Sequence, residues 1–221
     1  MVRPPVELTT DLLLRAYSAG LFPMAASRLG HKLHWLDPER RGIMPLDRFH
    51  LPKRLARTVL SEPFEISVDR DFAATIAACA TPMEGRDDTW INPQIERLFT
   101  ELHHLGHAHS VECRLNGTLA GGLYGVSLGG AFFGESMFSF VTDASKVALV
   151  HLVARLRLGR FRLLDTQFVT EHLKQFGARE IPRGLYKAQL ADALRAPALW
   201  AADPDPAALT AEIRALAARK L

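Results

Sequence analysis

The stretch that decides the fold is HSVECRLNGTLAGGLYGVSLGGAFFGES, residues 109–136. Two strand-like runs, residues 109–115 and residues 118–128, flank the dipeptide Asn116-Gly117. Both positions of this dipeptide tolerate positive φ, so it forms a two-residue hairpin turn without strain. Residues 131–136 then supply another strand-like run. The stretch therefore predicts three consecutive antiparallel strands.

Helical and strand patterns continue on both sides of these strands. Toward the C-terminus, the pattern predicts a long helix over residues 143–158, a buried strand over residues 161–168 and a short helix capped by Thr170. Toward the N-terminus, Asn92 and Pro93 are suited to the N-cap and first position of a helix with one apolar side. This order of elements predicts an α+β fold with one mixed sheet flanked by helices, not repeating βαβ units.

The beginning of the chain differs from the rest. A first helix, capped by Thr9 or Thr10, precedes residues 21–45, where several prolines discourage long helices. We therefore predict a small N-terminal domain over residues 1–45 and a main domain over residues 46–221.

Shorter elements complete the prediction. Pro52 suits the first position of a short basic helix over residues 51–60, and a strand over residues 64–68 precedes a helix over residues 71–80. Near the C-terminus, Asp205 begins an Ala-rich helix that is expected to bury little and to be peripheral.

The composition indicates a globular protein of a reducing compartment. The 221 residues are 48% hydrophobic, which is enough for one sizeable core. Lys and Arg outnumber Asp and Glu by only 27 to 24, so any nucleic-acid footprint must be local. Cys79 and Cys113 lie far apart in apolar settings and are predicted to be buried thiols. With no leader-like start and no run of about 18 apolar residues, we expect a cytoplasmic protein that does not enter a membrane.

One carboxylate stands out in the run GGAFFGESMFSF, residues 129–140. Glu135 lies among glycine, aromatic and methionine residues that suit the wall of an apolar cavity. An ionised carboxylate is costly to bury there unless a neighbour donates to it or it binds the ammonium group of a ligand. The alternative is a structural glutamate that caps a helix or braces a loop.

A second candidate pair lies in LLDTQF, residues 163–168. Asp165 and Gln167 are two residues apart, so on a regular strand they point to the same face. A substrate amine is one partner that could satisfy both of them. A hydrogen-bond network that ties the sheet to a helix explains them equally well.

Metal and phosphate sites are not expected. His107 and His109 share a strand face, but Glu112 falls on the opposite one and no HExxH or CxxC motif supports a metal site. The glycines of residues 117–130 lie inside strands, whereas a phosphate-binding loop needs them at a turn from strand to helix. We predict no metal and no cofactor.

The basic helix offers one candidate for nucleic-acid contact. Lys53 and Arg57 are four residues apart and share a helix face, with Arg54 beside them. These three side chains could contact phosphates, although a solvated helix face is the more common explanation.

Taken together, several stretches resemble the leucyl/phenylalanyl-tRNA-protein transferase family of the bacterial N-degron pathway. The resemblance runs in order through LLLRAYSAGLFPM, HWLDPERRGIMPL, DDTWI, LHHLGHAHSVE, LAGGLYGVSLGGAFFGESMFS, DASKVALVHL and LLDTQFVTEHLKQFGAREIPR. It implies a C-terminal domain of the acyltransferase superfamily, similar in architecture to N-acetyltransferases, after a small α/β N-terminal domain. It also implies an enzyme that transfers Leu or Phe, and less readily Met, from aminoacyl-tRNA to proteins that begin with Lys or Arg, marking them for degradation.

The resemblance assigns roles to individual residues. The family's catalytic residues correspond to Asp165, Gln167 and Glu135. The residues that hold the aminoacyl-adenosine correspond to Tyr17, Trp90, Phe99 and Met137. Met24 stands where the family often has a tryptophan, and only Trp35 is present where many relatives have two; a methionine can still cover an adenine by apolar contact.

From these residues we expect direct aminolysis of the tRNA ester. Asp165, oriented with Gln167, would accept hydrogen bonds from the incoming amine, and Glu135 would hold the donor's ammonium group or a ribose hydroxyl. Met137 and Phe138 would form the apolar pocket for Leu or Phe. The expected partners are the 3′ ends of Leu-tRNA and Phe-tRNA and acceptor proteins, and the chain is expected to be a monomer.

Two other functions are weighed against this one. An acetyl-CoA-dependent N-acetyltransferase would carry an R/Q-x-x-G-x-G/A loop at the start of the long helix, where this chain has FSFVTDASK. A non-enzymatic RNA-binding or adaptor protein would use Asp165 and Gln167 only as core braces.

Overall fold

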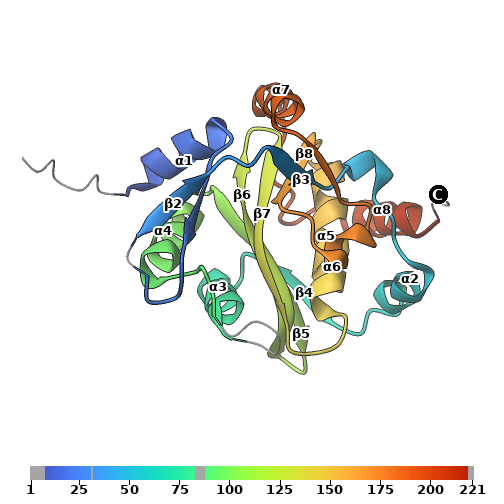
Figure 1. Cartoon of the computed structure of the whole chain (residues 1–221). Helices are drawn as coiled ribbons and strands as arrows, with labels where there is room; N and C mark the ends of the chain where they lie inside the picture. Colours follow the sequence, from blue (N-terminus) through green and yellow to red (C-terminus); the bar gives the residue numbers. More distant parts are fainter. Residues whose placement is uncertain (1–7, 31, 83–87, 219–221) are drawn as a thin grey trace, which may run out of the picture.

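The computed structural model describes residues 8–30, 32–82 and 88–218 (Figure 1). Two features singled out in the sequence lie outside these ranges: residues 1–7 at the start of the chain, and Asp87 of the DDTWI segment.

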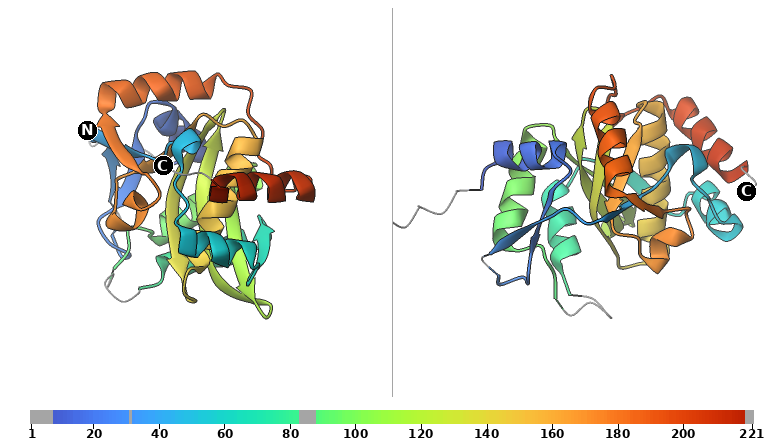
Figure 2. Two further views of the ribbon diagram at one scale, coloured as in Figure 1. Left: turned by 90° about the vertical axis from the view of Figure 1, so that its right-hand side faces the viewer. Right: turned by 45° about the horizontal axis from the view of Figure 1, so that its top comes forward.

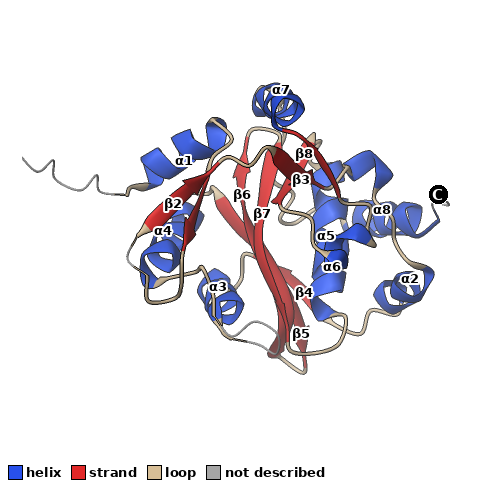
Figure 3. Cartoon of the chain, in the orientation of Figure 1, coloured by secondary structure: helices blue, strands red, loops and turns tan. Residues whose placement is uncertain are grey.

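The described residues form a seven-stranded mixed sheet with helices on both faces, together with a separate two-stranded sheet (Figure 3). The strands are β1 (Phe22–Ala25), β2 (Leu33–Leu36), β3 (Arg40–Ile43), β4 (Glu65–Val68), β5 (Ala108–Leu115), β6 (Thr118–Leu128), β7 (Ala131–Ser139), β8 (Leu163–Gln167) and β9 (Arg179–Pro182). The large sheet has the order β4-β5-β6-β7-β8-β3-β9, and β7 and β8 are its parallel pair. The predicted α+β fold with one mixed sheet is confirmed.

Eight α-helices and one short 3₁₀ helix are present in the described residues. They are α1 (Thr10–Ser18), η1 (Leu46–Arg48), α2 (Lys53–Leu60), α3 (Phe72–Ala80), α4 (Pro93–His104), α5 (Ala144–Leu158), α6 (Glu171–Lys174), α7 (Arg183–Leu194) and α8 (Pro206–Ala218). Helices α3 and α4 cover one face of the sheet, and α5 covers the other with α8 beyond it (Figures 1 and 2).

The predicted hairpin turn joins β5 to β6. Asn116 and Gly117 have φ of 51° and 78°, and Leu115 pairs with Thr118 across the turn. Positive φ at both central residues suits the twist of the flanking strands, as the Asn-Gly dipeptide predicts.

Helix ends follow the local sequence. The side chains of Thr9, Asn92 and Thr170 each accept a hydrogen bond from a backbone N–H in the first turn of the helix they cap, as predicted. Pro52 occupies the N-cap of α2 and not its first position, a shift of one residue.

The C-terminal helix is less peripheral than the sequence indicates. In α8, Ile213 and Leu216 are buried and belong to the core around α5. Arg157 of α5 also pairs with Glu212. The prediction that this helix buries little is therefore wrong, because two apolar residues three positions apart suffice to dock one helix face.

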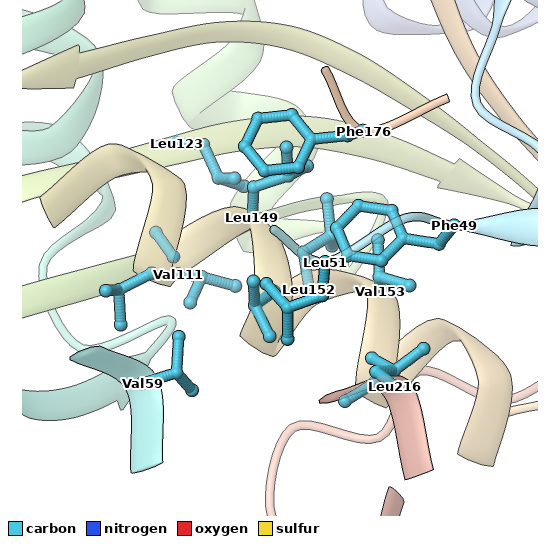
Figure 4. Close-up of a cluster of buried hydrophobic side chains, with 14 of the residues drawn as sticks. Phe49, Leu51, Val59, Val111, Leu123, Leu149, Leu152, Val153, Phe176 and Leu216 are labelled. Carbon is cyan, nitrogen blue, oxygen red and sulfur yellow. The ribbon is translucent and has the colours of Figure 1, made fainter. Parts of the chain in front are cut away.

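Two hydrophobic cores lie on opposite faces of the sheet. Strand alternation divides neighbouring residues between them: Leu123 and Phe132 pack toward α5, whereas Tyr124 and Phe133 pack toward α3 and α4. Figure 4 shows the core on the α5 side, where Leu123, Leu149 and Leu152 lie close together. Burial of each such side chain contributes about 1.5–3 kcal/mol.

The N-terminal residues contribute to both sheets. Among the strands that the structure describes, β1 and β2 pair only with each other, whereas β3 pairs with β8 and β9 of the large sheet. The domain boundary at residue 45 stays a prediction, and the strand just before it lies in the main sheet. Cys79 and Cys113 are buried thiols, as predicted. None of the described helices has the length and apolar character needed to span a membrane.

Candidate functional site

A cavity of about 590 Å³ opens where the two parallel strands diverge. The pairing of β7 with β8 ends at Phe133 and Asp165. Beyond these residues, the cavity is lined by Gly134 to Ser139 of β7, by Thr166 and Gln167 of β8 and by Phe168 after it. The end of a parallel pairing thus leaves room for a ligand between two strands of the same sheet.

The cavity walls are predominantly apolar. The apolar residues that line them come from β1, β6, β7, β8, α5, α6 and the segments just before α4 and after β8: Phe22, Pro23, Met24, Trp90, Leu123, Met137, Phe138, Leu149, Leu152, Leu164, Phe168 and Leu173. A site of this size with few polar groups suits a small apolar ligand or an apolar part of a larger one.

Glu135 reaches the cavity through an irregularity in β7. Gly125 pairs with Gly134 and Tyr124 pairs with Ser136, so Glu135 is the extra residue of a β-bulge. A bulge changes the direction of a side chain relative to the regular alternation, and such bulges are frequent beside active sites.

The carboxylate of Glu135 is held by protein donors on one oxygen. The hydroxyl of Tyr17 donates to Oε1 over 2.7 Å, and Nε2 of Gln167 lies 3.5 Å from the same atom. Burial raises the pKa of Glu135 to about 8; the hydrogen bond from Tyr17 and the charge of Arg41 oppose this rise, and the charge of Asp165 adds to it. Glu135 can therefore change its protonation state near neutral pH when a charged ligand arrives.

Gln167 also lies at a register irregularity. Gly42 of β3 pairs with Gln167 and Ile43 pairs with Asp165, which leaves Thr166 as an extra residue. Gln167 has a φ of 54°, and the backbone N–H of Phe168 donates to the carbonyl of Thr166 over 2.6 Å. This three-residue turn with positive φ is a rare and strained form of the γ-turn.

Asp165 does not lie on the cavity wall. Its side chain is 0% exposed, and its carboxylate oxygens accept hydrogen bonds from protein donors. Arg41 donates to both carboxylate oxygens, Tyr186 donates to Oδ2 over 2.6 Å, and the backbone N–H of Gln167 donates to Oδ1 over 2.8 Å. The two residues expected to share one face thus differ: Gln167 lines the cavity, whereas Asp165 lies behind it.

The predicted substrate-binding residues also divide into two groups. Met24, Trp90, Met137 and Phe138 line the cavity. Tyr17 and Phe99 are fully buried, Tyr17 behind Glu135 and Phe99 edge-on against the ring of Tyr124.

The basic helix α2 lies apart from the cavity, and its three cations are not equivalent. Arg54 makes a bidentate ion pair with Asp143, with distances of 2.6 and 2.9 Å. This contact, together with the hydrogen bond from Lys146, lowers the pKa of Asp143 to about 2, although burial alone would raise it. Lys53 and Arg57 are exposed. Arg54 therefore ties α2 to the start of α5, and Lys53 and Arg57 are the side chains with room to meet a phosphate.

Sequence reasoning missed several residues of the site. Arg41 is the main one; its guanidinium packs against the rings of Phe22 and Tyr186 at 4.4 and 4.6 Å. Thr166 and His172 line the cavity, and their buried Oγ1 and Nε2 atoms have no hydrogen-bond partner among the described residues. Burial and then the charge of Lys146 lower the pKa of His172, which favours the neutral ring. The sequence feature that could have pointed to Arg41 is its position directly before Gly42 in a segment with several prolines.

Two of the three residues considered for a metal site, His109 and Glu112, have other partners. His109 contacts Asp69 through Nδ1 over 2.8 Å, and Glu112 accepts hydrogen bonds from Ser67 and Ser110. In the part of the chain that the structure describes, no group of three potential metal ligands is found.

The geometry combines an apolar cavity with one titratable carboxylate and one amide on the same wall. Such a wall can bind an amine or ammonium group next to an apolar side chain. It offers no nucleophile placed next to a base among the residues described, so the arrangement favours direct reaction between two bound substrates over a covalent intermediate.

Comparison with known proteins gives concordant matches over most of the chain. Residues 43–191 match the family model described as leucyl/phenylalanyl-tRNA protein transferase, and residues 6–39 match the model of that family's N-terminal domain. The chain is 65% identical over 187 residues to the leucyl/phenylalanyl-tRNA–protein transferase of Paramagnetospirillum magneticum, covering 85% of this chain and 90% of the relative. The protein of the same name from Rhodopseudomonas palustris is 60% identical over 198 residues, 90% of this chain and 88% of the relative. That from Phenylobacterium zucineum is 62% identical over 186 residues, 84% of each chain.

Proposed function

The chain belongs to the leucyl/phenylalanyl-tRNA protein transferase family, and from that premise we propose that it moves Leu or Phe, and less readily Met, from aminoacyl-tRNA to the N-terminal Lys or Arg of acceptor proteins. It is an aminoacyltransferase, as its family is. Acceptors tagged in this way would be directed to degradation in the N-degron pathway, and the reaction would take place in the cytoplasm.

The apolar cavity with Glu135 on its wall is the observation that carries this proposal. Leu, Phe and Met share an apolar side chain beside a free α-amino group. Leu149, Leu152 and Leu164 give the side chain an apolar surrounding, and Glu135 gives the amino group a carboxylate. Such a pocket rejects charged side chains strongly but separates apolar ones only modestly, which explains the tolerance of Met.

The 3′ adenosine of the tRNA is proposed to lie at the mouth of the cavity. Trp90 offers an aromatic surface for stacking, and Met24 offers a flexible apolar one. Lys53 and Arg57 would contact phosphates farther along the acceptor strand, with Arg54 holding their helix in place.

The reaction is the aminolysis of an ester. The neutral α-amine of the acceptor attacks the ester carbonyl, a C–N bond forms, and the C–O bond to the ribose breaks. The proton lost by the amine goes to the departing ribose oxygen. Positioning supplies most of the acceleration, because the ester is already activated.

Glu135 and Gln167 are the two residues that would touch the reacting groups. Glu135 binds the donor's α-ammonium group, which favours the ionised carboxylate. Gln167 is not basic, so its amide aligns the attacking amine by accepting an N–H and does not remove the proton. Asp165 acts from behind the wall as a positioning residue, since its oxygens already accept four donors.

The test is transfer of labelled leucine from Leu-tRNA to an Arg-initiated peptide by the native chain. We expect transfer to this peptide, none to its N-acetylated form, and little to a Glu-initiated peptide. Glu135→Gln should reduce transfer strongly, whereas Glu101→Gln on the exposed face of α4 should not. Absence of transfer by the native chain, or acetylation of the peptide from acetyl-CoA instead, would reject the proposal.

A further inference from the structure

We propose that Arg41 is a positioning residue for the transfer reaction, which fixes the conformation of Gln167 at the cavity wall by acting through Asp165. The inference rests on the proposed function and adds to it a residue that does not touch either substrate.

Arg41 is held in one orientation. Its side chain is 1% exposed, its Nε and Nη2 donate to the two oxygens of Asp165, and its Nη1 donates to the carbonyl of Gly20 over 3.1 Å. The rings of Phe22 and Tyr186 contact the guanidinium plane. A planar fork with these contacts has a single arrangement, which Lys cannot reproduce.

Asp165 connects the fixed guanidinium of Arg41 to the turn at Gln167. Its Oδ2 accepts from Arg41 over 2.7 Å and from Tyr186 over 2.6 Å. Its Oδ1 accepts from Arg41 and from the backbone N–H of Gln167 over 2.8 Å. The carboxylate therefore joins a fixed guanidinium on one side to the backbone of Gln167 on the other.

Gln167 needs such support because its backbone is strained. A φ of 54° for a residue with a Cβ persists only where the surroundings enforce it. This backbone conformation changes the direction of the side chain. A residue that continued the regular alternation of β8 would turn its side chain to the same side as Asp165, whereas Gln167 lines the cavity.

The residue after Arg41 serves the same turn. A Cβ on Gly42 would lie 2.6 Å from the backbone carbon of Phe168 and 2.9 Å from Oγ1 of Thr166. Two consecutive residues of β3 thus shape the turn at Gln167, one by leaving space and one through an ion pair.

The charges around Glu135 give a second readout. The groups that face it are Tyr17 from α1, Asp165 and Gln167 from β8, and Arg41 from β3. Asp165 raises the pKa of Glu135 and Arg41 lowers it. Loss of Arg41 should therefore move the acid limb of the pH–rate profile upward, and Asp165→Asn should move it downward. A change that only loosened the fold would hydrate Glu135 and move the limb downward, because burial is the main cause of its raised pKa; an upward movement in Arg41→Met is therefore not explained by loosening.

The experiment measures leucine transfer by Arg41→Met, Arg41→Lys, Asp165→Asn and the double variant Arg41→Met/Asp165→Asn. Arg40→Met, the exposed neighbour on the same strand, is the matched control. We expect Arg41→Met to lower kcat about 100-fold, with KM for Leu-tRNA changed less than about threefold. In the Asp165→Asn background, the same substitution should have little further effect, because both residues act along one path.

The outcomes separate this inference from the proposed function. If the native chain and Arg40→Met transfer leucine but folded Arg41→Met retains the native kcat, Arg41 is not a positioning residue. The inference is also overturned if the fold-reduction in kcat of the double variant equals the product of the reductions caused by Arg41→Met and Asp165→Asn alone. If Arg41→Met does not fold, Arg41→Lys decides: a reduction in kcat of at least about tenfold supports the inference, and a native kcat rejects it. Failure of the native chain to transfer leucine counts against the proposed function instead.

Discussion

The hydroxyl of Tyr17 in α1 donates a hydrogen bond of 2.7 Å to Oε1 of Glu135, the bulged residue of β7. These residues are 118 positions apart in the chain. The contact joins the first helix to the one titratable carboxylate that lines the cavity in the described part of the chain. The N-terminal helix therefore influences the charge in the candidate site without lining it.

Replacing Tyr17 by Phe tests this influence. The hydrogen bond from Tyr17 lowers the pKa of Glu135, so its loss should raise that pKa further above its value of about 8. The acid limb of kcat/KM for Leu-tRNA should then move to higher pH. Because a buried acceptor loses its partner, we also expect about 1–3 kcal/mol of lost stability. If the acid limb does not move, Glu135 does not determine the pH dependence of kcat/KM. The amine of the acceptor peptide is the same for the native chain and the variant, so it cannot cause a difference between their profiles.

Replacing Glu135 by Gln should lower the transfer activity and increase the free energy of unfolding at high pH. The folded pKa of about 8 lies above the ordinary value of 4.5, so the native chain loses stability as pH rises from about 4.5 through about 8. The amide has no charge to bury. Urea denaturation should therefore show Glu135→Gln to be more stable than the native chain by about 1–2 kcal/mol at pH 9, with the advantage vanishing near pH 4. An advantage that does not depend on pH would contradict the burial of this charge.

Replacing Leu152 by Phe should narrow the cavity and change donor selectivity. Leu152 is buried on α5 and lines the cavity. The larger side chain should reduce transfer of Phe more than transfer of Leu, by about tenfold in the ratio of kcat/KM values. Leu156→Phe is the control, since Leu156 is buried in the same helix but does not line the cavity. Both variants should lose stability from overpacking, and only the first should alter the ratio.

Removing the two exposed cations of α2 should weaken tRNA binding without changing the chemistry. For Lys53→Ala/Arg57→Ala we expect a higher KM for Leu-tRNA at an unchanged kcat. The slope of log affinity against log salt should become shallower by about 1–2. Arg97→Ala, an exposed cation on α4, gives the comparison for a general charge effect. Equal effects of the two changes would remove α2 from the tRNA-binding surface.

Local sequence rules predicted elements where each element is regular. The Asn116-Gly117 turn and the caps at Asn92 and Thr170 depend on contacts within a few residues, and all three were predicted correctly. The error at α8 has the opposite origin, because its docking depends on α5, more than 50 positions away. Met137 and Phe138 could be placed on the cavity because their stretch is rich in apolar and aromatic residues.

The sequence by itself determined the class of fold, the three consecutive strands β5, β6 and β7 and the run that carries Glu135, since periodicity and turn residues are local properties. Tertiary structure alone decided that Gln167 reaches the cavity and that Asp165 does not. Glu135 and Gln167 lie at two irregularities of strand pairing, where the alternation that predicts side-chain direction fails. Asp165 keeps the regular direction and is therefore buried against Arg41, a residue that the chain brings to it from 124 positions away.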